Sequence, residues 1–175
     1  MKTAIVTKSS PILRKQALPV PIKDISTKKI QNVLKRMKTA LKREDDGVAI
    51  AAPQIGESLR IFIVSGRAQN LIKKNDTGES KEIFPDMVFI NPEISKLSKT
   101  KIMMEEGCLS VRWLYGLVER SEKATIIAFD EKGKKFQMGA SGLLAQIFQH
   151  ENDHLNGILF IDKAINVENL PPRLR

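Results

Sequence analysis

SGLLAQIFQHENDHLNG, residues 141–157, predicts a helix with one apolar face and two candidate metal ligands. We expect this helix over about 141–155, with a stop at Gly157. Its apolar face consists of four side chains at helical spacing: Leu143, Leu144, Ile147 and Phe148. His150 and His154 are four residues apart, so their imidazoles project from nearly the same face, about 6 Å apart along the axis. Two nitrogen atoms can therefore share one cation.

A carboxylate inside this motif favours hydrolytic chemistry. Glu151 follows His150 directly, where it can reach a water bound to the same metal. Two histidines placed at random in this chain would fall four apart only about once in ninety. A pair of buried imidazoles without partners would also be costly, and a metal satisfies both. The motif therefore predicts metal-assisted hydrolysis with Glu151 as general acid/base.

A catalytic site of this kind needs a third protein ligand, and the composition restricts the choice. The chain has only two histidines, and Cys108 is its only cysteine. A lone cysteine is usually a small hydrophobic residue. Here it lies in EGCLS, residues 106–110, where the neighbouring glycine and serine favour a turn at a site. Cys108 is weak evidence alone, and becomes the outstanding candidate when it is combined with the histidine pair.

The remaining sequence predicts an α+β fold with mostly antiparallel sheets packed around the central helix. An amphipathic helix is expected over 27–43, after an extended N-terminal arm. Strands are predicted at 60–64, 87–90, 101–105, 117–120, 124–130 and near 135–139. Residues 47–56 are expected to form a loop, and 65–85 a polar loop or insertion. We find no linker, and expect a single catalytic domain over 1–175.

Composition narrows the setting in which the protein works. Its formal charge of +9 favours an anionic partner such as the ribosome, although general basicity explains it equally well and no nucleic-acid-binding motif accompanies it. No apolar run approaches the ~20 residues of a membrane helix, and the N-terminus does not resemble a signal peptide. A single cysteine agrees with a reducing compartment. We expect a cytoplasmic protein that does not bind membranes.

Three segments together resemble the signature motifs of the peptide deformylase family: GVAIAAPQ (47–54), EGCLS (106–110) and QHENDH (149–154). The arm SSPILRKQALPV (9–20) is also similar to the N-terminal segment of that family, and the likeness covers most of residues 1–165. The resemblance implies a metal-dependent hydrolase that removes the N-formyl group from the formyl-methionine of newly made polypeptides and releases formate.

The resemblance also implies a role for each matching residue. Cys108, His150 and His154 would hold the metal, with water in the fourth position. Glu151 would take a proton from that water and later deliver one to the leaving amine. Two groups would stabilise the oxyanion, Gln54 and the backbone N–H of Leu109. The implied native metal is Fe²⁺, with Zn²⁺, Ni²⁺ or Co²⁺ able to occupy the site.

The methionine side chain of such a substrate requires an apolar pocket near the metal. The candidate substrate-binding residues are Gly47, Ile50, Met104, Leu143 and Ile147, although plain core packing explains each apolar one singly. We expect Asp153 beside the ligands or in an ion pair at the helix end. The matching family positions suggest that Glu106 and Arg120 form a supporting charge pair.

Two departures from the family pattern lie beside the predicted cleft. The family has a second glycine where this chain has Ala49. If that backbone needs a positive φ, alanine would be strained by ~1 kcal/mol or more; if only close approach matters, its methyl group is tolerated or narrows the groove. After EGCLSV the family commonly continues with proline, whereas this chain has the bulky segment RWLY, residues 112–115. That segment could alter peptide binding or contact a partner.

Two other functions stay open. Metallopeptidases and amidases also use His-Glu-x-x-His helices, so the substrate could carry another acyl group; Cys108 and GVAIAAPQ favour formyl-methionine. The chain could also be a catalytically silent, metal-stabilised binding protein whose basic surface is its function. The intact Glu151 argues against the silent protein.

Overall fold

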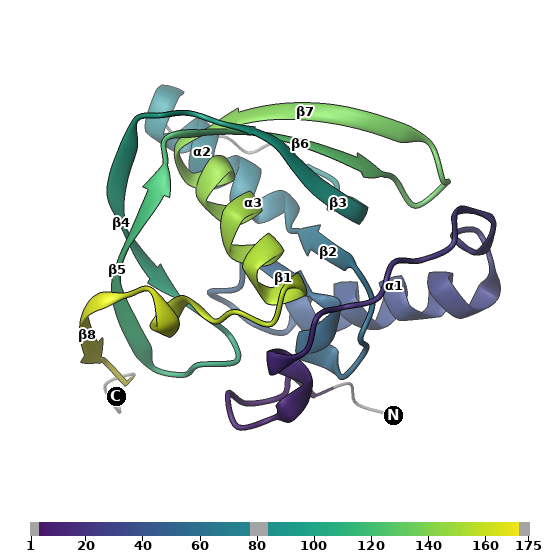
Figure 1. Ribbon diagram of the computed structural model, residues 1–175, viewed down its shortest axis with the longest axis horizontal. Coiled ribbons are helices and arrows are strands. Elements are labelled where there is room, and N and C mark those ends of the chain that lie inside the picture. Colours follow the sequence, from purple (N-terminus) through teal and green to yellow (C-terminus); the bar gives the residue numbers. More distant parts are fainter. Residues whose placement is uncertain (1–3, 78–83, 172–175) are drawn as a thin grey trace.

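The long C-terminal helix occupies the centre of the molecule, as the sequence predicted. The computed structural model describes residues 4–77 and 84–171. Helix α3 (Gly142–Leu155) lies enclosed by strands in Figure 1, and it contacts strands of both sheets. Both sheets are antiparallel throughout their described pairings. The α+β expectation is therefore confirmed.

The strands form one sheet of five and one of three. The larger sheet has the order β1 (Ala49–Ala51), β2 (Ile61–Val64), β3 (Met87–Leu97), β6 (Lys123–Phe129) and β7 (Lys135–Ser141). The smaller one has the order β4 (Lys101–Gly107), β5 (Leu114–Ser121) and β8 (Ile165–Asn169). All four residues of β2 are buried, because the strand is covered on both faces.

Helix α1 (Lys28–Lys42) is the predicted amphipathic helix. Its buried side chains recur at helical spacing: Ile30, Val33, Leu34, Met37, Ala40 and Leu41. They pack into one core cluster with Ile50 of β1 and Ile61 and Ile63 of β2. A second cluster fixes α3 against the larger sheet through three aromatic rings. Between ring centroids, Phe89 lies 4.5 Å from Phe62, on which it stacks, and 5.2 Å from Phe148, which it meets edge-on.

The prediction of a polar loop over 65–85 was wrong for its first half. Residues Gly66–Thr77 form helix α2, and residues 78–83 lie outside the described part of the chain. Gly66 suggested a loop, but its role is close packing, because a Cβ there would lie 1.8 Å from the carbonyl oxygen of Phe84. The helix buries Ala68 fully while Leu71 stays largely exposed, so its amphipathic pattern is weak in the sequence.

Strand β3 continues past Asn91-Pro92, where the sequence predicted a stop. The register with β6 shifts between Ile90 and Glu93, and Asn91 has a φ of 49°. Asparagine tolerates this left-handed conformation, and a bulge accepts a proline that donates no ladder hydrogen bond. The Asn91 side chain also bonds the backbone N–H and C=O of Val20, at 2.8 and 2.7 Å, which holds the N-terminal arm.

Two short strands were missed as well. Strand β1 lies inside the predicted loop 47–56, and β8 lies beyond the last predicted helix. Three residues of β1 are too few for a period to show, and every residue of β8 is exposed, so neither has a clear alternation. None of the helices in the described ranges has both the length and the apolar character needed to span a bilayer.

Candidate metal centre

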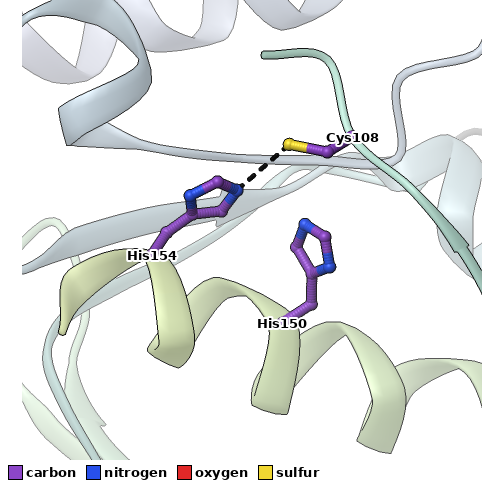
Figure 2. A group of neighbouring side chains, drawn as sticks. All are labelled: Cys108, His150 and His154. Atoms are coloured by element: carbon purple, nitrogen blue, oxygen red, sulfur yellow. Dashed lines mark hydrogen bonds between the residues drawn. The ribbon is translucent and has the colours of Figure 1, made fainter. Parts of the chain in front are cut away.

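Cys108, His150 and His154 come together in the structure. Figure 2 shows the two imidazoles on one side of α3, with Cys108 facing them from the segment that follows β4. One ligand atom from each residue lies within 4.8 Å of the other two. The Sγ atom of Cys108 is 3.2 Å from Nε2 of His154, and the imidazole centroids are 5.0 Å apart.

This donor set fits one divalent transition metal. A tetrahedral ion at ordinary metal–sulfur and metal–nitrogen bond lengths requires donor atoms about 3.5 Å apart, which small movements of these side chains provide. One thiolate and two imidazoles suit Zn²⁺, Fe²⁺, Co²⁺ or Ni²⁺ and disfavour Mg²⁺ and Ca²⁺, which prefer oxygen. Three protein ligands leave a position open, as in catalytic sites.

The electrostatics of the cluster favour the ligand form of the cysteine. Burial alone would raise the pKa of the Cys108 thiol, but the charge of His154 and hydrogen bonds with both imidazoles lower it to about 5. At neutral pH the sulfur is therefore a thiolate, the form that binds metals. Burial acts to lower the pKa of His150, yet hydrogen bonds with Cys108 and Glu106 raise it well above its ordinary value.

A buried chain of charged groups holds His150 in place. Nδ1 of His150 lies 2.9 Å from Oε2 of Glu106, and Arg120 donates to both Glu106 oxygens at 2.7 and 2.9 Å. Arg120 also donates to Asp153 at 2.6 Å, and Lys163 donates to the same carboxylate at 2.7 Å. Such contacts fix the ring orientation and leave Nε2 for the metal.

The expected Glu106–Arg120 pair is thus present, and it joins Asp153. Burial raises the pKa of Glu106, but hydrogen bonds from His150 and Arg120 lower it to about 2. Lys163 could not be predicted from the sequence, because a lysine that directly follows a short 3-10 helix (Phe160–Asp162) resembles any surface lysine. Helix α3 is therefore held at two points, through His150 by Glu106 and through Asp153 by Arg120 and Lys163.

Glu151 lies beside the cluster and is 4 % exposed. Burial raises its pKa to about 6, although the charges of His150 and His154 act to lower it. Its Oε2 atom is buried and has no hydrogen-bond partner among the described residues, as is also true of Nδ1 of His154. Buried polar atoms without partners mark places where water, an ion or a substrate belongs.

Gln54 reaches the same point from the short 3-10 helix Ala52–Ile55 after β1. Its Oε1 accepts a hydrogen bond from the Ala51 N–H at 2.7 Å, which directs Nε2 toward the cluster. Nε2 lies 3.6 Å from Sγ of Cys108 and 3.2 Å from Oγ of Ser110. Sequence reasoning missed Ser110, although it lies within the EGCLS segment. Gln54 therefore presents a fixed N–H donor at the site.

The site opens into a cleft of about 260 Å³. Glu151, Gln54 and Leu109 line it, together with three of the five predicted substrate-binding residues: Gly47, Leu143 and Ile147. Ile50 and Met104 do not. Ile50 is fully buried in the cluster that faces α1, because alternate residues of β1 point to opposite sides. Met104 is paired with Val118 within the smaller sheet, outside the cleft lining.

Ala49 lies on β1 in ordinary extended backbone. Among the described residues other than glycine, only Asn91 and Asn166 have a positive φ. Alanine at position 49 therefore carries no backbone strain, and its methyl group lines the cleft instead. Glycine is required at Gly107, where a Cβ would lie 2.6 Å from the Tyr115 ring. The tyrosine thereby packs directly on the strand that leads to Cys108.

The comparison with protein families agrees with this geometry. The family model described as polypeptide deformylase matches residues 2–170. The chain belongs to the peptide deformylase family. This family removes N-formyl groups from nascent polypeptides, and its metal dependence fits the Cys-His-His cluster. The resemblance expected from the three motifs is confirmed, and the chain is a deformylase-type hydrolase.

Individual relatives cover nearly the whole chain. A peptide deformylase of Halothermothrix orenii is 41% identical over 157 residues, which is 90% of each chain. The crystal structure of a class I type b peptide deformylase from Acinetobacter baumannii, with Met-Ala-Ser bound, superposes with a TM-score of 0.79, at 33% identity and with coverage of 93% of this chain and 99% of that one. The peptide deformylase of Thermotoga maritima gives 0.78 at 31% identity, with coverage of 94% and 99%.

Proposed function

We propose that Cys108, His150 and His154 hold the single divalent ion of deformylation and that Glu151 is the general acid/base. The observation that supports this most directly is the convergence of three soft donors within 4.8 Å beside a buried carboxylate. When bound, the ion supplies Lewis acidity that lowers the pKa of water and polarises the formyl oxygen. Glu151 accepts a proton from the attacking water and returns one to the methionine nitrogen as formate leaves.

We propose that Gln54 and the backbone N–H of Leu109 stabilise the developing oxyanion. Nε2 of Gln54 already points toward the ligands, because Oε1 is held by Ala51. Donors fixed before the reaction need no reorganisation as charge develops, and each such donor contributes about 10²–10³ to the rate in acyl transfer. Leu109 directly follows the proposed ligand Cys108 and lines the cleft, which supports a role for its N–H at the reacting carbonyl.

The methionine side chain would lie against α3, where Leu143 and Ile147 line the cleft. The peptide backbone would run beside Gly47 and the edge of β1, which is the outermost strand of its sheet. An extended peptide can add to such an edge through main-chain hydrogen bonds. The Met-Ala-Ser peptide in the Acinetobacter relative supports a substrate of this class.

We propose Fe²⁺ as the native ion, with Ni²⁺, Co²⁺ or Zn²⁺ as possible replacements. A thiolate donates more charge than an imidazole, so a Zn²⁺ ion here is a weaker Lewis acid. The same thiolate is oxidisable when it is bound to Fe²⁺. We therefore expect the Fe²⁺ form to be the more active one under anaerobic conditions and to lose activity in air, while the Ni²⁺ form persists.

Formate release tests this function. We expect the protein loaded anaerobically with Fe²⁺, or with Ni²⁺, to release stoichiometric formate from formyl-Met-Ala-Ser, measured with a coupled formate assay. Acetyl-Met-Ala-Ser and unblocked Met-Ala-Ser are the controls, and we expect at least a 100-fold preference for the formyl group. Hydrolysis of the acetyl or unblocked peptide instead would favour a general amidase or peptidase. No turnover of any of them would favour the silent binding protein.

We also propose that the basic face of α1 associates with the ribosome, which would place the enzyme in the cytoplasm beside its nascent substrates. Helix α1 contains six basic and no acidic residues. Arg36 and Lys38 are ion-paired with Glu57 and Glu131. The other four are exposed: Lys28, Lys29, Lys35 and Lys42. A row of exposed lysines without acidic neighbours on the helix attracts the phosphates of ribosomal RNA.

We expect replacement of those four lysines by glutamine to reduce co-sedimentation with ribosomes at least fivefold at 50 mM salt. Wild-type association should fall steeply as salt rises, because phosphate contacts release counterions. The matched control replaces four exposed lysines elsewhere, Lys96, Lys99, Lys101 and Lys123. An equal reduction in both variants would show that net charge alone is responsible, and would contradict a specific α1 surface.

A further inference from the structure

Two chain segments form two walls of the cleft. Residues 46–49 run into β1, and residues 112–115 run from the Cys108 segment into β5. If the formyl group reacts at Glu151 and the methionine lies against α3, as proposed above, the rest of the peptide must leave between these walls. The residues that shape them are therefore placed to select the substrate beyond methionine.

An ion bridge joins the two walls. Arg112 donates to both oxygens of Asp46, at 2.6 and 3.1 Å, and to Glu44 at 2.6 Å. The hydrogen bond with Arg112 lowers the pKa of Asp46, so this pair is charged at neutral pH. The Arg112 side chain is 25% exposed. A bidentate, partly buried guanidinium–carboxylate contact has a defined geometry that a single surface ion pair lacks.

The same arginine fixes an aromatic wall. Its guanidinium carbon lies 4.5 Å from the centroid of the Trp113 ring, a cation–π contact. The carbonyl oxygen of Trp113 accepts a hydrogen bond from the Leu170 N–H at 2.9 Å. The side chain and backbone of Trp113 are thus held by separate contacts, and Trp113 is half-buried in the cleft lining.

We propose that Arg112 is a positioning residue that holds Trp113 as an apolar wall selecting large apolar side chains after formyl-methionine. A wall that is already ordered loses little conformational freedom when a side chain packs on it. Each methylene that leaves water against such a surface contributes to affinity. Leucine beyond methionine therefore binds more tightly than alanine. Without the bridge, the indole moves and this selectivity is lost.

The fluorescence of Trp113 offers a direct test, because the chain has one tryptophan. The Ni²⁺-loaded enzyme is titrated with the deformylated peptides Met-Leu-Leu and Met-Ala-Ala. We expect the wild type to bind Met-Leu-Leu about tenfold more tightly. In Arg112→Ala the ratio should fall to about two, and the emission of the free enzyme should shift to the red. In Arg112→Ala, the KM for formyl-Met-Leu-Leu should rise toward that for formyl-Met-Ala-Ala, while kcat should stay unchanged.

Three further variants separate the bridge from general damage. Glu44→Gln with Asp46→Asn leaves the arginine in place but removes its partners, and we expect it to reproduce the loss. Arg112→Lys keeps the charge without the bidentate geometry and should retain part of the ratio. Lys101→Ala removes an exposed ion pair with Glu119 outside the cleft lining and should change neither ratio nor emission.

The outcomes distinguish this inference from the proposed function on which it rests. An unchanged Leu-to-Ala ratio in Arg112→Ala, or an equal loss of affinity for both peptides, would overturn the role of Arg112. Failure of the wild type to release formate from either formyl peptide would overturn deformylation instead. The fluorescence titration still reports on the wall in that case, because it needs no turnover.

Discussion

Replacement of Glu151 by glutamine is expected to lower kcat for formyl-Met-Ala-Ser by about 10²–10⁴ while the bound metal stays near one equivalent. The amide has almost the same shape as the carboxylate, but it cannot accept the proton of the attacking water. Glu151 is not one of the three converging donors, so the ion does not depend on it. Formate release gives kcat, and atomic emission on the purified Ni²⁺-loaded variant gives the metal content.

A matched control is available in the same cleft. Glu105 also lines it but is exposed, and it belongs to β4 rather than to α3. Glu105→Gln should therefore keep kcat within a few-fold of the wild type, which excludes a general effect of lost negative charge. Cys108→Ala is expected to give the converse result, with metal and activity lost together. Turnover in Glu151→Gln close to the wild-type rate would refute the general acid/base role.

The contrast expected between Glu151→Gln, which keeps the metal, and Cys108→Ala, which loses it, follows from how the site is built. The sequence motif places two imidazoles and a carboxylate on one helix, so their mutual positions depend on local geometry alone. The thiolate comes from the segment that follows β4, 42 residues before His150, and only the packing of α3 against the strands brings it within reach. The proposed metal site therefore depends on the whole fold, whereas the proposed base depends on the helix alone.

The same distinction explains which structural features could be predicted. Helices α1 and α3 bury one face against a core, so apolar side chains recur with the helical period and their bounds were predicted within one residue. The strands β2, β6 and β7 were recognised for a similar reason. Helix α2 was missed because Gly66, which is required by contact with the Phe84 backbone, looks in sequence like a loop residue. No local pattern reports such a contact.

Two features near the site depend on long-range packing that the sequence alone does not reveal. Ile50 was one candidate for the apolar substrate pocket, with core packing as the alternative, and the alternation along β1 turns it into the core beside α1. The ion bridge of Arg112 with Glu44 and Asp46 depends on residues 66 to 68 positions apart. Sequence showed only that RWLY departs from the family pattern. The partners, and therefore a physical role for the departure, required the fold.

The charged chain behind His150 shows why the centre is stable as well as reactive. Glu106 binds His150 on one side and Arg120 on the other, and both members of the Glu106–Arg120 pair are almost completely buried. The pKa of Glu106 is lowered to about 2, so its contribution to stability is fully present above its ordinary pKa of 4.5 and is lost as the pH falls through about 2. One residue thus links the orientation of a ligand to the stability of the fold.

Arg120→Met should consequently destabilise the protein by about 3–5 kcal/mol, because it leaves Glu106 as a buried charge without its main partner. Asp153 would be affected less, since Lys163 still binds it. The measurement is urea denaturation of the Ni²⁺-loaded protein at a fixed excess of metal, because a ligand bound to the native state adds to its stability. Lys101→Met, which breaks a pair more than half exposed on both sides, should change the unfolding free energy by less than about 1 kcal/mol.

A double variant separates two contributions to the lost unfolding free energy: the buried Glu106 charge without a partner, and the lost packing of the Arg120 side chain. Adding Glu106→Gln to Arg120→Met removes the buried charge, so part of the unfolding free energy should return. Metal affinity should not return, because the neutral amide holds the His150 ring less firmly than the carboxylate does. If the single variant loses less than 1 kcal/mol, the chain from His150 to Asp153 contributes little to stability. Recovery of metal affinity together with stability in the double variant would mean that His150 needs no anionic partner, and that helix packing alone orients it.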